Sequence, residues 1–176
     1  MHCHYCHGYE VAGKRLGLLA TSERSIQGAL LLPDWSNDVT LFTNGVLAPD
    51  QNQQAALRAR RVAVEAELVE ALLGTLPVLT GVKLRDSRTV PIDALFTASR
   101  TRMASPLAEQ LGCEFEDGTS GPVIRTDARK ETTVLGVYAA GDAARAAHNA
   151  TWASSDGVTA GICAHQSLVL SQVACS

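Results

Sequence analysis

Apolar and polar positions alternate in a strand–helix–strand order at the start of the chain. An apolar stretch at residues 15–20, RLGLLA, precedes apolar residues at helical spacing between Ser22 and Leu32. We expect the Ser22 hydroxyl to cap this helix and Pro33 to end it. A second strand is expected at Asp38–Thr43, before a turn at Asn44-Gly45. This order predicts parallel strands joined by a right-handed crossover.

The next fifty residues predict a small antiparallel meander inserted between two parallel strands. A polar helix is expected at about Asp50–Arg60 and a third strand at Val62–Ala66. Turn residues at 74–77 and 86–87 then separate three short strands, expected at Leu68–Leu73, Leu79–Arg85 and Thr89–Ile92. The stretch Asp93–Ser99 is expected to return to the parallel sheet.

The pattern of apolar and polar residues changes at about Arg100. This change predicts that the chain is divided into two domains, residues 1–99 and 100–176. The second part predicts a short helix ended by Gly112, two strands and a long helix. The expected bounds are Ser105–Leu111 for the short helix, Val123–Thr126 and Val134–Ala140 for the strands, and about Ser154–Val173 for the long helix.

Composition supports an α/β protein and excludes several classes of function. The chain is 46% hydrophobic and 19% charged, which is typical of a globular protein, and aromatic residues make up only 5%. A net charge of −3 without a basic patch argues against a nucleic-acid partner. No apolar run is long enough to span a bilayer, and residues 1–8 lack the pattern of a signal peptide. We therefore expect a cytoplasmic protein without a membrane partner.

Two of the five cysteines, Cys3 and Cys6, stand close together in the segment HCHYCHGY. Their CxxC spacing suits a redox dithiol, in which nearby histidines would stabilise a thiolate. Zinc would need a second pair of ligands, and neither a second CxxC nor an HxxxH follows. The string CxxCH also matches a haem attachment motif, which occurs outside the cytoplasm. A Cys/His-rich terminus without function is the remaining alternative, and spacing alone favours the redox pair without excluding the others.

The residues around the pair resemble the thioredoxin-reductase branch of the flavin-dependent disulfide oxidoreductases. In that family the CxxC lies just before the first strand–helix–strand unit, as Cys3–Val11 lies before the strand Leu16–Ala20 here. A second segment, Thr132–Asp142, is similar to the family's second FAD signature, although Leu135 stands where the family usually has proline. The Cys-His-Gly-Tyr-Glu sequence resembles a bacterial and fungal subgroup that includes dithiol oxidases acting on small natural products.

The resemblance implies a fold, a chemistry and a set of site residues. The fold would be an α/β Rossmann-like pyridine-nucleotide domain with a small antiparallel meander, followed by the C-terminal half of a FAD-binding domain. The cofactors would be FAD and NADPH, and the partner a thioredoxin-like protein or a small-molecule dithiol, with a homodimer as the expected assembly. Cys6 would meet the flavin, Cys3 would exchange with substrate and His7 would assist. The residues implied in FAD binding are Gly141, Asp142, Asn149, Ala150 and Thr151.

Two departures from the family bear on function. The glycine-rich turn that lets a pyrophosphate approach the backbone is replaced by Ala20–Ser25, which holds no glycine, places Glu23 at the turn and offers Arg24 as the opposite charge. The second strand ends at Thr43 without an acid for a ribose hydroxyl. We therefore expect a nucleotide-binding scaffold that binds NADPH very weakly.

The second departure is that no GxGxxG segment precedes residue 1. We expect a truncated form that requires a missing FAD segment, and we expect its last helix to expose apolar side chains and to favour self-association. The alternative function is a non-catalytic remnant or interaction module that keeps the Rossmann scaffold, or a Cys/His metal-binding segment. We expect Trp35 to pack rather than to act, and Cys113, Cys163 and Cys175 to be incidental or small buried residues.

Overall fold

The computed structural model describes residues 1–98 and 100–174 and divides into two structural units, Met1–Ser99 and Arg100–Ser176. Each unit has its own buried apolar cluster. The last residue of the strand predicted at Asp93–Ser99 lies outside the described residues, as does Cys175. Whether the two units are a pyridine-nucleotide domain and part of a FAD domain stays a prediction.

The first unit is built on a four-stranded parallel sheet in the order β3-β2-β1-β7. Leu16 at the start of β1 pairs with Val39 of β2 and with Ala94 of β7, so the central strand has parallel neighbours on both sides. This confirms the predicted parallel pairing and the return of the last strand to the sheet. The four strands are β1 (Leu16–Leu19), β2 (Val39–Phe42), β3 (Val62–Glu65) and β7 (Ala94–Thr97).

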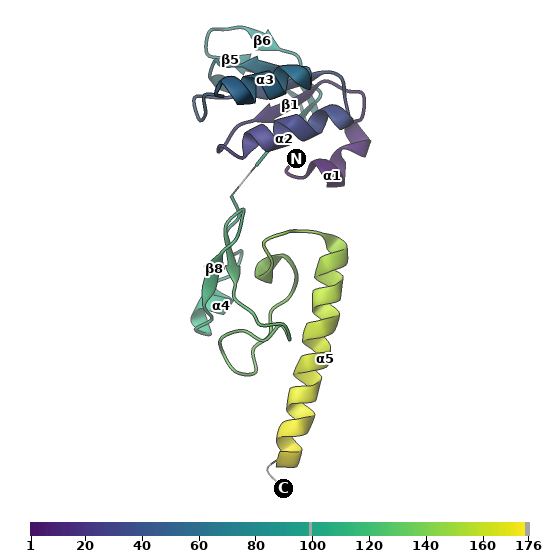
Figure 1. Ribbon diagram of the computed structural model, residues 1–176, viewed down its shortest axis with the longest axis vertical. Coiled ribbons are helices and arrows are strands. Elements are labelled where there is room, and N and C mark those ends of the chain that lie inside the picture. Colours follow the sequence, from purple (N-terminus) through teal and green to yellow (C-terminus); the bar gives the residue numbers. More distant parts are fainter. Residues whose placement is uncertain (99, 175–176) are drawn as a thin grey trace. The chain divides into compact units, whose positions relative to one another are not determined.

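Alternate side chains of these strands enter two different cores. Leu16 and Leu18 join a cluster under the helices α2 (Ser25–Leu31) and α3 (Gln51–Ala59), which lie side by side in Figure 1. Leu19 and Phe42 point to the opposite face, where the antiparallel strands cover them. The sheet is therefore buried on both faces, which explains why its strands read as almost continuous apolar runs.

The antiparallel sheet has the order β4-β5-β6 and comprises β4 (Val69–Thr75), β5 (Val78–Leu84) and β6 (Thr89–Val90). This confirms the predicted meander, with a last strand shorter than expected. Buried Val82 and Leu84 of β5 pack on Phe42 of the parallel sheet and join the two sheets.

The predicted cap of α2 is wrong. The helix begins at Ser25, and its N-cap residue Arg24 makes no side-chain cap bond. The hydroxyl of buried Ser25 instead accepts hydrogen bonds from the backbone amides of Thr21 and Ser22, at 3.1 and 3.4 Å. These hydrogen bonds therefore close the turn at residues 21–25 before the helix starts. The helix ends at Leu31, and Pro33 lies in the 3₁₀ turn η2 (Leu32–Asp34) that follows.

The second unit holds little regular structure apart from its long final helix. Its elements are α4 (Leu107–Gln110), β8 (Phe115–Asp117), β9 (Pro122–Ile124), η3 (Gly141–Ala144) and α5 (Ala150–Ala174). The strand predicted at Val134–Ala140 is wrong, because that stretch makes only a bridge between Tyr138 and Glu131. A strand needs a neighbouring strand along its length, and the described residues of this unit supply none.

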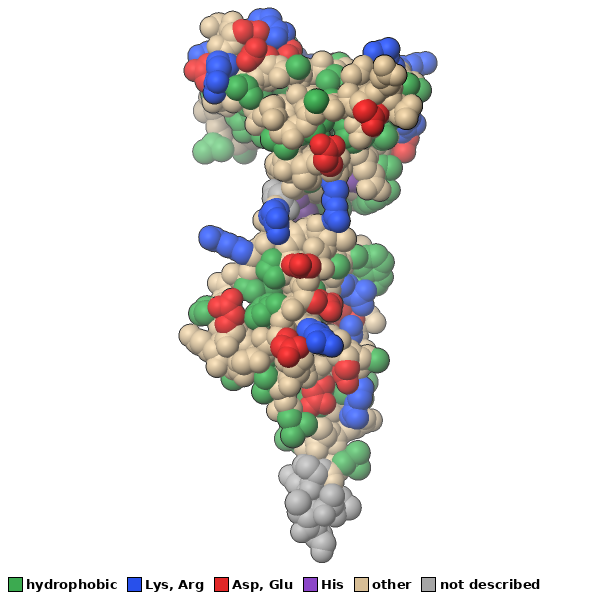
Figure 2. All heavy atoms as spheres, turned by 60° about the vertical axis from the view of Figure 1, so that its left-hand side comes forward, with side chains coloured by type: hydrophobic (Ala, Val, Ile, Leu, Met, Phe, Trp, Pro, Cys, Tyr) green, Lys and Arg blue, Asp and Glu red, His purple; other side chains and the backbone are tan. Residues whose placement is uncertain are grey.

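Helix α5 carries an exposed apolar surface. Its side chains Val158, Ile162, Leu168, Val169 and Leu170 are between 45% and 65% exposed, which agrees with the exposure expected for the last helix. Figure 2 shows hydrophobic side chains among charged ones on the surface of this unit. Among the described residues, no helix combines the length and the apolar character that crossing a membrane requires.

Candidate functional site

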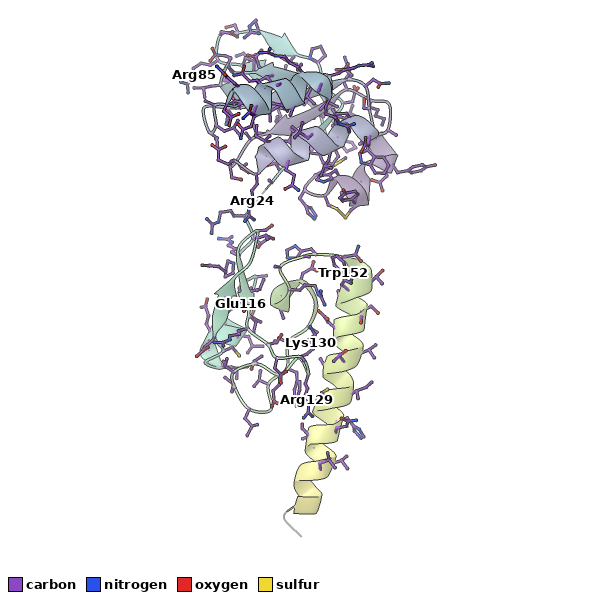
Figure 3. The ribbon with its side chains drawn as sticks, viewed as in Figure 1. Arg24, Arg85, Glu116, Arg129, Lys130 and Trp152 are labelled. Atoms are coloured by element: carbon purple, nitrogen blue, oxygen red, sulfur yellow. A yellow bond between two sulfur atoms is a disulfide. The ribbon has the colours of Figure 1, made fainter. Side chains whose placement is uncertain are left out.

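The CxxC segment forms a short helix at the start of the chain. Cys3 caps α1 (His4–His7) and forms a disulfide with Cys6, visible as a yellow bond near α1 in Figure 3. Cys6 is exposed and Cys3 is partly exposed, so reagents in solution can reach the pair. The backbone amide of Cys6 donates to the sulfur of Cys3 at 3.1 Å. After reduction, this donor would stabilise a thiolate at Cys3.

Close packing under Gly8 fixes α1 to the rest of the unit. A β-carbon at Gly8 would lie 2.5 Å from two ring carbons of Trp35 and 2.4 Å from the carbonyl oxygen of His4. The 3₁₀ helix η1 (Tyr9–Val11) follows directly and buries Val11 in the core. Trp35 itself packs against that core, as expected for a structural tryptophan. The glycine of the CHGY sequence is therefore required by packing.

The histidines around the pair have different surroundings. The Nδ1 atom of His7 lies 3.2 Å from a carboxylate oxygen of Glu10, which orients the ring next to Cys6. Burial lowers the pKa of His4, because the charged ring is disfavoured away from water. Its ring lies 4.9 Å from that of Tyr5, centre to centre. The sequence did not single out Glu10 as a partner of His7. The two residues are three positions apart, a spacing that brings side chains together on a helical turn.

Two backbone bonds hold the N-terminus against the sheet. The terminal amino group of Met1 donates to the carbonyl of Leu95, and the amide of Thr97 donates to the carbonyl of Met1, at 2.8 and 2.9 Å. The CxxC helix therefore starts beside the carboxyl end of β7. Ligands of open α/β sheets bind at this edge. A cavity of about 310 Å³ lies there, bounded by α1, α2 and the sheet.

The turn after β1 does not fit a dinucleotide pyrophosphate. The amides of Thr21 and Ser22, which would face a phosphate, donate to the hydroxyl of Ser25. The hydroxyl of Thr21 donates to the carbonyl of Ala98 at 2.5 Å. Very weak binding of NADPH stays a prediction.

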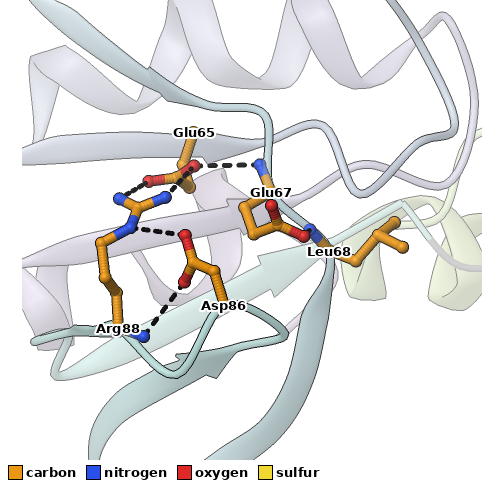
Figure 4. Close-up of polar contacts among 5 residues, drawn as sticks. All are labelled: Glu65, Glu67, Leu68, Asp86 and Arg88. Atoms are coloured by element: carbon orange, nitrogen blue, oxygen red, sulfur yellow. Dashed lines mark hydrogen bonds and ion pairs between the residues drawn. The ribbon is translucent and has the colours of Figure 1, made fainter.

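Polar side chains at the carboxyl ends of β2 and β3 make structural hydrogen bonds, and Figure 4 shows those of Glu65 at the end of β3. Arg88 donates to both carboxylate oxygens of Glu65, at 2.7 and 3.2 Å, and to Asp86 at 2.7 Å. These hydrogen bonds from Arg88 are the main reason that the pKa of Glu65 is lowered. The side chain of Asn44 accepts from the amide of Val69 at 2.9 Å. This edge therefore joins the two sheets, and the carboxylates described there, Glu65 and Asp86, are engaged by Arg88.

The five residues implied in FAD binding lie in η3 and at the start of α5. Gly141 has a φ of +69°, and a β-carbon there would lie 3.2 Å from that of Ala153. Glycine therefore allows both the left-handed backbone and the close approach to α5. The side chain of Asn149 accepts from the amide of Thr151 at 2.9 Å and caps α5, which begins at Ala150 rather than at Ser154. Asp142 is exposed.

A buried carboxylate fixes these two elements to each other. Asp156 is 3% exposed and receives two hydrogen bonds from Arg145, at 2.8 and 2.9 Å, with Lys130 at 3.0 Å. Arg145, followed by Lys130, holds the pKa of Asp156 well below its usual range. Lys130 and Trp152 are labelled in Figure 3, and the Arg145 guanidinium lies 5.6 Å from the Trp152 ring centre. The segment around Asp142 is therefore held against the start of α5.

The exposed carboxylate of Asp142 and the capped start of α5 fit a hydroxyl-bearing part of a cofactor, such as the ribityl chain of FAD. The described residues show no counterpart for the ADP part. Across residues 1–98 and 100–174, no three His, Cys, Asp or Glu side chains form a group that could hold a metal ion. The disulfide also engages both sulfurs of the pair.

The sequence matches known disulfide oxidoreductases over most of its length. The family described as pyridine nucleotide-disulphide oxidoreductase matches residues 50–157, more than half of the chain. A thioredoxin reductase of Leptosphaeria maculans, sirT, is 30% identical over 173 residues, which cover 91% of this chain and 52% of that protein. The chain thus spans about half the length of this relative.

Solved structures of oxidoreductases are also similar to this chain over most of its length. An oxidoreductase from Agrobacterium tumefaciens is 41% identical with a TM-score of 0.87, covering 96% of this chain and 56% of its own. The protein HlmI is 36% identical with a TM-score of 0.86, and the match covers 98% of this chain and 53% of HlmI. A putative thioredoxin reductase, TrxB from Bacillus anthracis, is 23% identical and shares the fold, with a TM-score of 0.84. The predicted α/β fold is confirmed, and the chain belongs to the pyridine nucleotide-disulphide oxidoreductase family, within which it is similar to the thioredoxin reductases.

Proposed function

We propose that this chain carries the thiol–disulfide exchange centre of a flavin-dependent disulfide oxidoreductase. The observation that carries the proposal is the solvent-accessible Cys3–Cys6 disulfide on a helix that Gly8 and Trp35 fix to the core. An accessible pair can meet a substrate, and a fixed helix keeps the two sulfurs close together after reduction. In this proposal Cys3 and Cys6 are the redox pair and His7 is the proton carrier beside Cys6.

The exchange begins with attack of a substrate thiolate on the sulfur of Cys3. The bond between Cys3 and Cys6 breaks, and the electron pair leaves on Cys6. His7, which Glu10 orients, is the neighbouring group that can give that sulfur a proton. The second substrate thiol then attacks the substrate sulfur of the mixed disulfide. The sulfur of Cys3 leaves as a thiolate, stabilised by the amide of Cys6.

The cofactor of the whole reaction is proposed from the residues that fit it. Asp142 and the start of α5 would hold the ribityl part of FAD, and when bound FAD supplies a two-electron acceptor for the reduced pair. A segment that binds the ADP part is needed to complete this site. NADPH is not part of the proposal, because the turn at Thr21 and Ser22 does not fit it. We further propose a homodimer in the cytoplasm, on the resemblance and the sequence alone.

Single-cysteine variants test the exchange. The protein is treated with an aromatic disulfide and a small amount of a dithiol. Cys6→Ser is then expected to accumulate a mixed disulfide on Cys3. Cys3→Ser is expected to form the corresponding mixed disulfide on Cys6 at least tenfold more slowly. Cys113→Ser, a change at a buried free cysteine, is the control and should behave like the unmodified chain. Equal trapping at both positions would contradict the assigned roles, and trapping at neither would contradict the function.

A further inference from the structure

Three segments of the second unit meet at one acidic side chain, Asp156. It is the only Asp, Glu, Lys or Arg among the 25 residues of α5, and its side chain is 5% exposed. Arg145, directly after η3, donates to both carboxylate oxygens at 2.8 and 2.9 Å, and Lys130 adds an ion pair at 3.0 Å. Such a cluster adds little stability over well-packed apolar side chains, because the loss of hydration offsets most of the attraction. Its presence on an otherwise uncharged helix therefore indicates a role other than stability.

The loop that carries Lys130 is itself fixed by hydrogen bonds. Lys130 has a φ of +67°, a left-handed conformation that residues other than glycine adopt rarely. The carboxylate of Asp127 closes this turn by accepting from two backbone amides, at 2.8 and 2.9 Å. The amide of Ala139 donates to the carbonyl of Lys130 at 3.0 Å, so the turn lies beside the segment that leads into η3. The ammonium group therefore reaches Asp156 from a turn that backbone bonds hold in place.

Arg145 could bind either of two carboxylates and binds only one of them. Asp142 precedes it by three residues in η3, and side chains at this spacing lie one above the other in a 3₁₀ helix. The spacing alone would pair Arg145 with Asp142. Arg145 instead has an extended backbone and binds Asp156. Within the part of the chain that the structure describes, the Asp142 side chain is exposed and makes no hydrogen bond or ion pair.

We propose that Asp156 is a positioning residue of the flavin site, which holds Arg145 away from Asp142 and so keeps the Asp142 carboxylate free for ligand hydroxyls. The inference rests on the proposed function, in which Asp142 binds the ribityl part of FAD, and adds the residue that makes Asp142 available. A carboxylate paired with a guanidinium must give up that charge-assisted pair before it can accept a hydrogen bond from a hydroxyl. A carboxylate without a partner accepts that hydrogen bond directly.

Two contacts explain why Arg145 stays on Asp156. Trp152 precedes Asp156 by one helical turn, so both side chains lie on one face of α5, and Arg145 contacts both of them. Pairing with the exposed Asp142 would exchange these contacts for a solvated ion pair, which contributes little. Removing the charge of Asp156 ends this preference. It leaves a partly buried guanidinium for which Asp142 is the nearest acid in the sequence.

The first test measures how fast phenylglyoxal modifies Arg145 in residues 1–176 without flavin, by mass spectrometry of the peptides. Asp142→Asn alone is expected to change the rate less than twofold, because Asp142 does not hold Arg145 in the unmodified chain. In an Asp156→Asn background, the same change is expected to raise the rate at least threefold, because Arg145 has then turned to Asp142. Arg125, which is exposed and pairs with Glu114, is the reference in the same digest. Equal effects of Asp142→Asn in the two backgrounds would overturn the proposal.

The second test measures FAD affinity by flavin fluorescence quenching, with a FAD segment supplied separately to the chain. Asp156→Asn is expected to weaken FAD binding about tenfold, the scale of a hydrogen bond to a charged group that must first be broken. Asp156→Asn/Arg145→Met is expected to bind within threefold of the unmodified chain, because no guanidinium is left to occupy Asp142. A purely structural role predicts the opposite order, since the double variant removes one contact more. Asp117→Asn, which removes an exposed carboxylate of β8, is the matched control.

A third variant covers the case in which Asp156→Asn does not fold. Arg145→Met alone keeps Asp156 paired with Lys130 and leaves Asp142 free, so it is also expected to bind FAD within threefold of the unmodified chain. Circular dichroism checks that each variant is folded.

The outcomes separate this inference from the proposed function. A folded double variant that binds FAD as weakly as Asp156→Asn, or a tenfold loss in Arg145→Met, would overturn the role of Asp156 and leave the cofactor site in place. An unmodified chain that binds no FAD with the supplied segment would overturn the cofactor site itself, and with it the role of Asp156 there.

Discussion

Gly8 lies so close to Trp35 that a single added methyl group at Gly8 would come within 2.5 Å of the indole ring. The two residues are far apart in sequence, yet together they set the position of α1, the helix that carries the CxxC pair. The backbone amide of Gly13 donates to the carbonyl of Trp35 at 2.9 Å, a second link between the same segments. The orientation of the CxxC pair therefore depends on a contact between the N-terminal segment and the loop before β2.

Replacing Gly8 with alanine should destabilise the first unit by about 1–3 kcal/mol, the usual cost of overpacking a well-packed site. The methyl group must displace the Trp35 ring or the backbone of α1. Urea unfolding followed by tryptophan fluorescence measures the change. Gly157→Ala on α5 is the control, because a β-carbon there meets no neighbouring atom. An alanine variant at position 8 as stable as the unmodified chain would show that this contact is looser than described.

The ion pair between Arg15 and Asp93 should make stability depend on pH in the acid range. The hydrogen bond from the Arg15 side chain lowers the pKa of Asp93 to about 2, from an ordinary value near 4. A lowered carboxyl pKa stabilises the fold above the unfolded value, and this contribution is lost as pH falls through the folded value. Asp93→Asn should therefore lose less stability than the unmodified chain between pH 4 and pH 2.

Urea midpoints at pH 6, 4 and 2 measure that difference. The matched control is Asp117→Asn, which removes an exposed carboxylate of β8 and should keep the full acid dependence. Parallel pH profiles for Asp93→Asn and the unmodified chain would contradict the assignment of this dependence to Asp93.

NADPH should bind more weakly than about 1 mM, equivalent to a binding free energy weaker than about −4 kcal/mol. The reason is that Ser25 engages the amides of Thr21 and Ser22, and that Arg88 pairs with Glu65 at the neighbouring strand ends. Calorimetric titration of residues 1–176 measures the affinity. A micromolar dissociation constant would mean that the turn reopens to admit a phosphate.

FAD added to residues 1–176 should not be retained in stoichiometric amount. Asp142 and the start of α5 can contact only part of the cofactor, and the exposed apolar side chains of α5 favour self-association. Flavin fluorescence quenching, followed together with sizing chromatography, tests both expectations. A monodisperse monomer with one bound flavin would contradict them, whereas binding restored by a separately supplied FAD segment would support the proposed cofactor site.

The strands of the first unit could be predicted from sequence because the sheet is buried on both faces. Leu16, Leu18 and Leu41 are apolar for that reason, so short apolar runs mark β1 and β2 directly. The strand expected at Val134–Ala140 has a similar apolar pattern, but the described residues supply no neighbouring strand, and only Tyr138 forms a bridge. A pattern of side chains reports burial and cannot report the presence of a partner strand.

The Cys3–Cys6 disulfide could be read from the spacing of the two cysteines, but its surroundings could not. The backbone of Met1 pairs with Leu95 and Thr97, a contact between opposite ends of the first unit that holds the start of the CxxC segment against the sheet. The Gly8–Trp35 contact is also non-local. The cap of α2 was predicted wrongly because Ser22 and Ser25 are both able to accept amide hydrogen bonds, and the buried hydroxyl of Ser25 does so.

The most direct test of the redox assignment is an equilibrium titration of the Cys3–Cys6 pair. Residues 1–176 are equilibrated in a series of thiol–disulfide buffers, trapped by alkylation and mapped by mass spectrometry, with Cys113 and Cys163 as internal references. We expect one reversible two-electron transition confined to Cys3 and Cys6, with both reference thiols alkylated throughout. If the pair forms no disulfide at any buffer ratio, the redox function assigned to this segment is wrong.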